Sequence, residues 1–311
     1  MEGLLSAPGF SPLTLVLNTS AGLTPTGDKL SRIESALPGA HVERVHAGLD
    51  AAGVARRAIE AGAETVVAAG GDGTVRAVAQ AVADAGALLG IIPGGTLNHL
   101  ARELNIPVRP ELAAAVVRRG HVREIDTGDV NGHVFVNNAV LGLYAAYALE
   151  REGRRRRGAP AAVAAAGAAL RVFAGNPVLR LRMRFDGREL LRYSLLVIVA
   201  NNEHKMQGYE LGARERLDAG RLWIYVMRPM TRAGLLRTAL RVISGRLERN
   251  QAFEVFQAAG AVVETGRSRI RLSLDGELLE LDAPLRFRSR PRALRVIVPA
   301  SGVQRRPASV L

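Results

Sequence analysis

Strand-like runs alternate with amphipathic stretches through the first part of the chain. The strand-like runs are LTLVLN at 13–18, HVERVH at 41–46, TVVAAGG at 65–71 and LLGIIP at 88–93. Stretches with helical spacing follow them near 27–37, 50–62, 75–85 and 96–105. Strands that alternate with helices in this way are typical of βαβ units. We therefore predict an α/β domain over residues 1–130, built on a doubly wound parallel sheet.

The pattern changes at about residue 122, where strand-like runs begin to dominate. Examples are LRLRMRF at 179–185, YSLLVIVANN at 193–202 and RIRLSLD at 269–275. Helical stretches interrupt them near 159–174 and 232–245. This pattern predicts a mostly antiparallel β-sandwich over 131–300, with a last strand that can return to the first domain, and a tail at 301–311.

Arginine alternates with apolar residues in three of these runs. The sets are Arg180, Arg182 and Arg184; Arg267, Arg269 and Arg271; and Arg286, Arg288 and Arg290. A period of two places each set on one face of its strand. Such a face is either the solvated side of a half-buried sheet or a surface that meets anionic lipid headgroups.

Composition limits the classes of protein. The 311 residues include no cysteine, which excludes disulfides and thiolate metal sites and suits a reducing cytoplasm. Residues 1–135 carry a net charge of −3 and residues 136–311 a net charge of +16, which together give the +13 of the chain. No run reaches the roughly 18 apolar residues that span a bilayer. We expect a cytoplasmic protein that associates peripherally with membranes.

The first candidate for chemistry is Gly70-Gly71-Asp72-Gly73-Thr74, which follows a buried strand and opens a helix. Glycines there let a phosphate approach the backbone, and the helix N-terminus attracts its charge. A tight turn that merely needs glycine would not explain the aspartate between the glycines. No lysine follows in the spacing of a Walker A loop, so nucleotide would be held in another way.

Two further polar turns follow strands of the same predicted sheet. Ile92-Pro93-Gly94-Gly95-Thr96-Leu97-Asn98 enters a helix after one strand, and Asn18-Thr19-Ser20-Ala21-Gly22 follows the first strand. Ligands bind parallel sheets beyond the carboxyl ends of the strands. Three such turns at one edge predict a nucleotide site.

These residues resemble the diacylglycerol kinase-like lipid kinases, a family that includes bacterial diacylglycerol and sphingosine-type lipid kinases. The resemblance covers nearly the whole chain. It rests on GGDGT at 70–74, PGGTLNHLAREL at 93–104, IDTGDVNG at 125–132 and DGE at 275–277. GGDGT alone is also similar to NAD kinases and phosphofructokinases, whose fold the first domain would share. The later motifs favour the lipid kinases.

The resemblance implies ATP and Mg²⁺ as cofactors. The implied nucleotide contacts are Asn18, Thr19, Ser20, Ala21, Gly22, His46, Gly70, Gly71, Asp72, Gly73, Thr74, Val75, Arg76, Thr96 and Asn98. Asp72 and Asp126 match acids that organise magnesium and phosphate, with Arg102 as a counter-charge. His99 stands where the family usually has aspartate, and His46 where it usually has threonine.

Asp275-Gly276-Glu277 ends a strand-like run, and Asp-Gly is by itself a strong hairpin signal. The resemblance implies instead that this acidic turn accepts the proton of a lipid hydroxyl. Either Asp275 or Glu277 could be the base, with the other orienting it.

The family also binds a structural metal in a loop written L-D-D-G-L. The corresponding residues here are Leu217-Asp218-Ala219-Gly220-Arg221, in which alanine replaces the second acid. The substitution argues against a metal on Asp218, which would then be a turn residue.

Taken together, the sequence predicts an ATP-dependent lipid kinase that makes a phosphomonoester from a diacylglycerol-like hydroxyl. An NAD kinase-like enzyme with a soluble substrate is one alternative, and a catalytically impaired nucleotide-binding regulator, motivated by His99 and Ala219, is another. We expect a lipid substrate at a membrane surface as the partner, with homodimer formation left open. Aromatic residues make up 4% of the chain, which disfavours nucleic acid.

Overall fold

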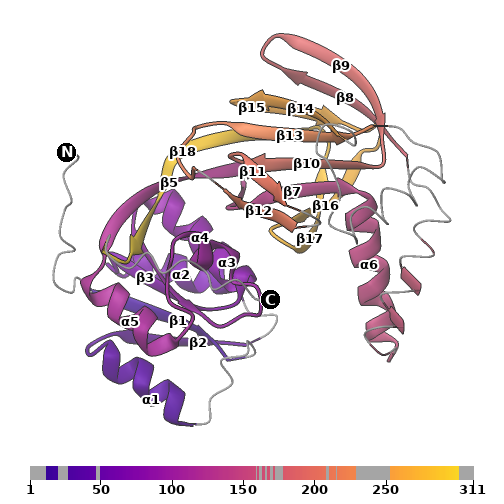
Figure 1. Ribbon diagram of the computed structural model, residues 1–311. Helices are drawn as coiled ribbons and strands as arrows, with labels where there is room; N and C mark the ends of the chain where they lie inside the picture. Colours follow the sequence, from indigo (N-terminus) through magenta and orange to yellow (C-terminus); the bar gives the residue numbers. More distant parts are fainter. Residues whose placement is uncertain are drawn as a thin grey trace. The chain divides into compact units, whose positions relative to one another are not determined.

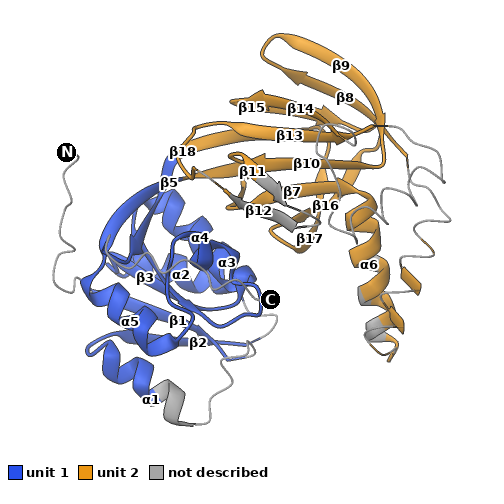
Figure 2. Ribbon diagram, viewed as in Figure 1, with its two compact units in different colours: residues 1–125, 292–311 blue, residues 126–291 orange. Residues whose placement is uncertain are grey.

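The structure is a computed structural model that describes residues 12–19, 27–46, 50–158, 160, 163–164, 167–168, 171, 178–207, 210–214, 216–228 and 253–300. The chain forms two compact units (Figure 2). Unit 1 comprises residues 1–125 and 292–311, and unit 2 comprises residues 126–291. The helix predicted near 232–245, most of the stretch at 159–174 and the tail at 301–311 lie outside the described residues.

A parallel sheet forms the centre of unit 1 (Figure 1). Its strands are β1 (Leu13–Asn18), β2 (His41–Val45), β3 (Thr65–Gly70) and β4 (Leu88–Pro93), in the order β2-β1-β3-β4. The last part of β18 (Leu285–Val298) adds a further parallel strand beside β4 through Arg295 and Val296. Every residue of β3 and β4 is buried, which explains why these strands are continuous apolar runs. The predicted α/β fold is confirmed.

Helices connect these strands, and their crossovers place them on both faces of the sheet. The helices are α1 (Gly27–Ala36), α2 (Ala51–Glu60), α3 (Asp72–Ala85), α4 (His99–Glu103) and α5 (Pro110–Arg119). The step from β1 to β2 and the step from β2 to β3 run in opposite directions across the sheet, so right-handed crossovers put α1 and α2 on opposite faces. Accordingly, α1 contacts α5 and α2 contacts α3.

The helix expected near 96–105 is shorter in the structure. It begins only at His99, because Asn98 has a φ of 49° in the left-handed region and interrupts helical geometry. The helix α5 was not predicted, although Pro110 at its start is a common signal for a first helical turn.

Unit 2 is a sandwich of two antiparallel sheets. The first part of β18 pairs with β15 (Gly260–Glu264), then β8 (Leu179–Phe185) and β9 (Arg188–Ser194). The second sheet has the order β14-β13-β10-β7-β16-β17. Its strands are β14 (Phe253–Ala258), β13 (Leu222–Met227), β10 (Leu196–Asn201), β7 (Asn138–Gly142), β16 (Arg269–Leu274) and β17 (Glu277–Asp282). Side chains from both sheets form one core, with Leu181 and Phe287 from the first sheet and Leu141 and Leu272 from the second. The predicted antiparallel sandwich is confirmed.

Shorter elements complete unit 2. They are β5 (His121–Val130), whose first residues belong to unit 1, β6 (His133–Phe135), α6 (Leu143–Arg156) and the hairpin of β11 (His204–Gln207) and β12 (Glu210–Arg214). The predicted boundary at residue 130 falls at the end of β5. The helix α6 was not predicted. None of the helices in the described part of the chain is long and apolar enough to cross a bilayer.

Candidate active site

The two glycine turns of unit 1 lie in direct contact. The first leads from β3 into α3, and the second follows β4. The N–H of Gly94 donates to the carbonyl of Gly70 over 2.8 Å. A Cβ atom on Gly95 would lie 2.8 Å from the Cα of Gly71, which is closer than real Cβ atoms come. Glycine at position 95 therefore permits the two backbones to touch.

Asp72 and Asn98 fasten this contact. The carboxylate of Asp72 accepts the backbone N–H groups of Asn98 over 3.0 Å and His99 over 2.8 Å. The Asn98 side chain is buried, and its amide bonds both the N–H and the carbonyl of Gly95, over 2.9 and 2.7 Å. Because Asp72 bonds the backbone of residue 99, histidine in place of aspartate leaves this contact intact.

The end of β1 joins the same edge. The Asn18 amide donates to the Thr74 hydroxyl over 2.9 Å, and the Thr19 hydroxyl bonds Nδ1 of His46 beyond β2. A Cβ on Gly70 would lie 2.6 Å from the Thr74 hydroxyl, so glycine is needed there too. The structure thus brings three of the predicted loops together, while Ser20, Ala21 and Gly22 lie outside the described residues.

The remaining predicted nucleotide residues differ in exposure. Val75 is 6% exposed and packs in the core of unit 1, so it can offer a nucleotide little of its side chain. Thr96 and Arg102 are exposed, and Gly73 and Arg76 are half-buried in the first turns of α3. The first turn of a helix leaves N–H groups without intrahelical acceptors. The start of α3, framed by glycines, can therefore hold a phosphate.

This packing gives a first prediction. Gly95→Ala forces the two turns apart, and overpacking of this kind costs about 1–3 kcal/mol. Gly71→Ala is the matched control, because its Cβ would lie 3.5 Å from the Cα of Gly95, an ordinary contact. Urea unfolding is expected to show a lower midpoint for Gly95→Ala than for Gly71→Ala. Equal midpoints would contradict the close contact between the two glycine turns.

In unit 2, the acidic turn is anchored by its aspartate. Asp275 and Gly276 have φ values of 48° and 92°, as in a two-residue hairpin between β16 and β17. The Asp275 carboxylate accepts three backbone N–H groups of the segment 136–138, over 2.7, 2.8 and 2.9 Å. Glu277 is exposed at the start of β17. Asp275 is therefore both part of a hairpin turn and an anchor for the segment 136–138.

Two residues that sequence analysis missed hold the same segment. Arg214 is 7% exposed and donates to the carbonyl of Val136 over 2.6 Å and to the side chain of Asn137 over 3.1 Å. The amide of Asn201 donates to the carbonyls of Val136 and Asp126, each over 2.8 Å. The only sequence signal was the polar pair Asn201-Asn202 after a long apolar run.

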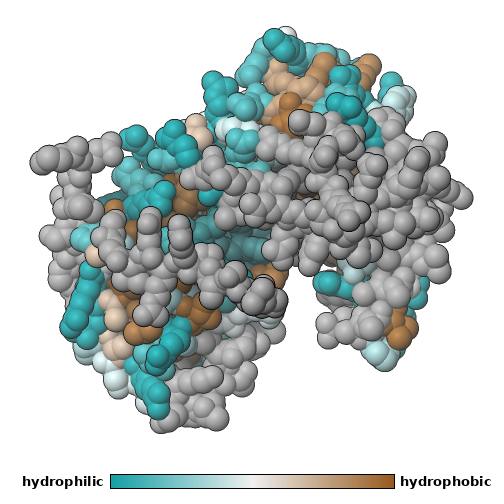
Figure 3. Space-filling view, viewed as in Figure 1, coloured by the Kyte–Doolittle hydropathy of each residue, from teal (hydrophilic) through white to brown (hydrophobic). Residues whose placement is uncertain are grey.

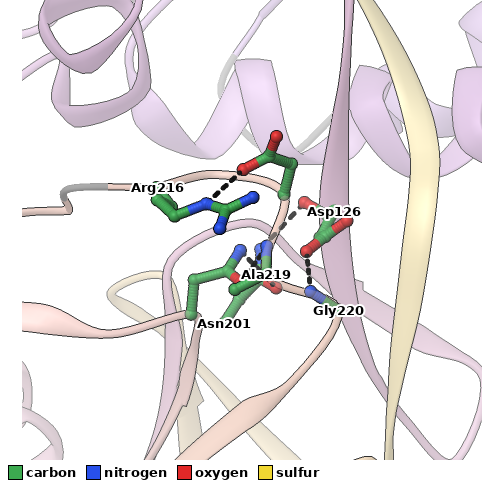
Figure 4. A network of polar contacts seen from close by, with 7 residues as sticks. Asp126, Asn201, Arg216, Ala219 and Gly220 are labelled. Carbon is green, nitrogen blue, oxygen red and sulfur yellow. Dashed lines mark hydrogen bonds and ion pairs between the residues drawn. The ribbon is translucent and has the colours of Figure 1, made fainter.

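Asp126 lies beside Ala219 and Gly220, in the loop that precedes β13 (Figure 4). It is 1% exposed, and its Oδ2 accepts the N–H of Gly220 over 2.6 Å. The N–H of Ala219 donates to the Asn202 side chain over 3.0 Å. Asp126 thus braces the loop, and its role toward magnesium stays a prediction.

The loop does not fit a structural metal. Ala219 offers no side-chain ligand, and Asp218 pairs with Arg216 over 3.1 Å. Within the described residues, no group of three or more histidine or acidic side chains could hold a metal ion. A nucleotide-bound magnesium needs only one or two carboxylates besides phosphate and water. Asp72 fits that need, because a carboxylate that accepts two N–H bonds keeps further acceptor sites.

Unit 2 also contains a mostly apolar cavity of about 150 Å³. Its lining comes from β7, α6, β8 and β16 and includes Leu141, Ala146, Leu179 and Ile270. The hydroxyl of Thr265, which also lines it, is buried and has no hydrogen-bond partner in the described structure. The cavity therefore suits an apolar chain that carries an occasional polar group.

A parallel-sheet unit with glycine turns at its strand ends, followed by an antiparallel sandwich, places the protein in the NAD kinase-like fold class. Residues 12–130 match the model of the diacylglycerol kinase catalytic domain, and residues 143–298 match the YegS C-terminal NAD kinase beta sandwich-like domain. The chain belongs to the diacylglycerol kinase-like lipid kinase family.

Individual relatives agree with this assignment. The chain is 33% identical to a probable lipid kinase YegS-like protein of Pseudomonas aeruginosa, over 81% of this chain and 82% of the relative. It is 29% identical to the diacylglycerol kinase of Bacillus subtilis, over 80% and 82%. A crystal structure from Bacillus anthracis strain Sterne, assigned there as a diacylglycerol kinase, shares the fold with a TM-score of 0.74, covering 97% of this chain and 98% of its own at 22% identity.

Proposed function

We propose that the protein transfers the γ-phosphate of ATP to the hydroxyl of a diacylglycerol-like lipid, giving ADP and a phosphomonoester. The observation that carries the proposal is the interlocked pair of glycine turns in a chain of this family. The N-terminus of α3 supplies N–H groups and a positive dipole end to the phosphates. Magnesium, when bound with the nucleotide, would neutralise charge on the transferred group.

The acceptor side of the proposal rests on unit 2. Glu277 takes the proton from the lipid hydroxyl as that oxygen attacks the γ-phosphorus, and the bond to the β-phosphate oxygen breaks. Asp275 positions the turn, because its oxygens already accept three N–H groups. The cavity beside α6 takes part of an acyl chain.

The test is incubation of pure protein with labelled ATP, magnesium and a total lipid extract, followed by identification of the labelled product. A labelled phospholipid monoester is the expected result. NAD in place of lipid tests the NAD kinase-like alternative. Label on NAD alone would overturn the proposal, and ATP binding without turnover on any acceptor would instead support the regulator.

The cavity leads to a second prediction. Ala146→Phe places a ring where the acyl chain would lie, and the loss of two buried methylene groups, at about 0.8 kcal/mol each, raises the KM for a long-chain acceptor by about tenfold. The KM for ATP should stay unchanged. A short-chain acceptor serves as the control in the same assay. An equal rise for both acceptors would show that the cavity does not hold the chain.

A further inference from the structure

The register of the first sheet of unit 2 gathers several of its arginines on one side. Val262 of β15 is paired with Arg184 of β8 on one flank and Arg286 of β18 on the other. Directly paired residues share a face, and alternate residues return to it. We call the outward side of β8, β9, β15 and β18 the arginine face. It carries Arg180, Arg182, Arg184, Arg286 and Arg288.

The opposite side of the same strands lies in the core of unit 2. Leu181 and Met183 alternate with the arginines of β8, and Phe287 lies between those of β18. The arginines therefore cannot turn inward without breaking the sandwich. Their orientation is fixed by the core.

Positive charge exceeds negative charge on the arginine face. Glu189 and Glu264 pair with Arg182 over 3.3 Å and with Arg184 over 2.7 Å. A buried aspartate, Asp129, pairs with Arg288 over 3.1 Å. Five arginines against these three acids leave an excess of two positive charges.

Two arginines account for this excess of positive charge. In the part of the chain that the structure describes, the side chains of Arg180 and Arg286 have no acidic partner. Both are exposed. They are therefore available to anions.

Exposed apolar side chains lie among these arginines. Leu191 and Tyr193 of β9 are paired with Arg182 and Arg180, and they are 51% and 57% exposed. Val178, next to β8, is 50% exposed. Figure 3 shows hydrophobic patches among hydrophilic ones in the part of the molecule where Figure 1 places β8 and β9.

The two arginines of the second alternating set that lie on β16 show none of these features. Arg269 and Arg271 of β16 face Glu280 and Asp282 of β17, with distances of 3.2 to 3.9 Å. On these two strands, two arginines meet two acids, while Arg267, the third member of the set, is exposed before the start of β16. None of the large, exposed hydrophobic side chains in the described residues lies on β16 or β17. The structure thus distinguishes the acid-paired arginines of β16 from an arginine face with unmatched charge.

We propose that the arginine face docks onto an anionic lipid bilayer. Unmatched guanidinium groups would meet lipid phosphates, while Leu191 and the Tyr193 ring enter the interfacial region, which favours amphipathic aromatic side chains. Nucleic acid fits less well, because a single aromatic side chain on the face gives little stacking. The inference goes beyond the proposed function and does not depend on it, since none of these residues takes part in phosphoryl transfer.

Flotation of the whole protein with vesicles tests the proposal. Binding is expected for vesicles of equal parts phosphatidylglycerol and phosphatidylcholine, and not for phosphatidylcholine alone. Arg180→Gln combined with Arg286→Gln should weaken binding about fivefold for each arginine removed. Arg269→Gln combined with Arg271→Gln removes the same charge from the acid-paired arginines of β16 and should bind like the wild type.

The apolar contribution has its own variant. Leu191→Thr combined with Tyr193→Thr keeps the strand preference of β9 and the charge of the face. It should reduce the binding that survives when salt rises from about 0.1 M to about 1 M, where the Debye length falls to about 3 Å. Unchanged binding at high salt would show that these side chains do not enter the bilayer and would overturn this part of the proposal.

Three results would overturn the whole inference. The first is wild-type vesicle binding by the Arg180/Arg286 variant. The second is an equal loss of vesicle binding in the Arg180/Arg286 and Arg269/Arg271 variants. The third is tighter binding of the protein to duplex DNA than to anionic vesicles. Phosphorylation of lipid dispersed in detergent micelles is measured in parallel. Because micelles need no docking, loss of vesicle binding with retained micelle turnover supports the docking face. A wild-type protein inactive in micelles but bound to vesicles would refute the proposed function alone.

Discussion

Replacement of Glu277 by glutamine is expected to lower the turnover number for lipid phosphorylation by about 10²- to 10⁴-fold, with ATP affinity unchanged. Glutamine keeps the size of the side chain but cannot accept the hydroxyl proton. Glu277 is exposed on the first residue of β17, so the substitution should leave the unfolding midpoint in place. Initial rates in lipid micelles and calorimetric ATP binding provide the two measurements.

Asp275→Asn should behave differently, although it lies two residues away. Its carboxylate accepts the N–H groups of Val136, Asn137 and Asn138, and an amide can satisfy only part of that set. The expected loss is about 1–3 kcal/mol of stability, together with lower activity. If Asp275→Asn kept full stability and lost all turnover while Glu277→Gln remained active, the roles of the two acids would be exchanged.

Most of unit 1 could be predicted because its central strands β3 and β4 are buried on both faces. Because every residue of β3 and β4 is buried, each strand is a run of apolar residues, and glycines mark the end of each run. Both signals are local in the sequence. The start of α4 could not be predicted, because the left-handed Asn98 is stabilised by bonds to Gly95 and Asp72 rather than by its own sequence. The helix α6 was not predicted because it directly follows a strand-like run.

The candidate site was predicted in its parts but not in its connections. Loops after parallel strands must meet at one edge, so Asn18, Gly70 and Asn98 could be grouped from order alone. The hydrogen bond from the N–H of Asn98 to the Asp72 carboxylate joins residues 26 apart, and no rule of sequence spacing predicts it. Arg214 was missed for the same reason, since a buried arginine looks like a surface one until its acceptors are known.

The arginine sets show the same limit. Alternation placed each set on one face, but it could not decide between a solvated surface and a binding surface. That decision needed the neighbouring strands, because Glu280 and Asp282 pair with Arg269 and Arg271, while Arg180 and Arg286 have no acidic partner in the described residues. Register between strands is set by the whole sheet, so one strand does not contain it.

Asp72→Asn is expected to impair both the fold and the chemistry of unit 1. The carboxylate accepts two backbone N–H groups, and an amide would turn one of its donors toward Asn98 or His99. Hydrogen bonds to a charged group contribute about 1.5–3 kcal/mol each, so the nucleotide-free protein should unfold at a clearly lower urea concentration. Lipid phosphorylation should fall as well, because the two glycine turns lose the bonds that hold them.

Glu60→Gln is the control, since Glu60 is an exposed acid of the same unit, at the end of the helix α2. It should change neither the unfolding midpoint nor the turnover number. ATP affinity measured with and without magnesium separates the two roles of Asp72. A residue that only holds magnesium would leave the nucleotide-free protein as stable as the wild type and weaken ATP binding only when magnesium is present. A residue that fastens the turns weakens ATP binding in both conditions, and that is the outcome that the bonds to Asn98 and His99 predict.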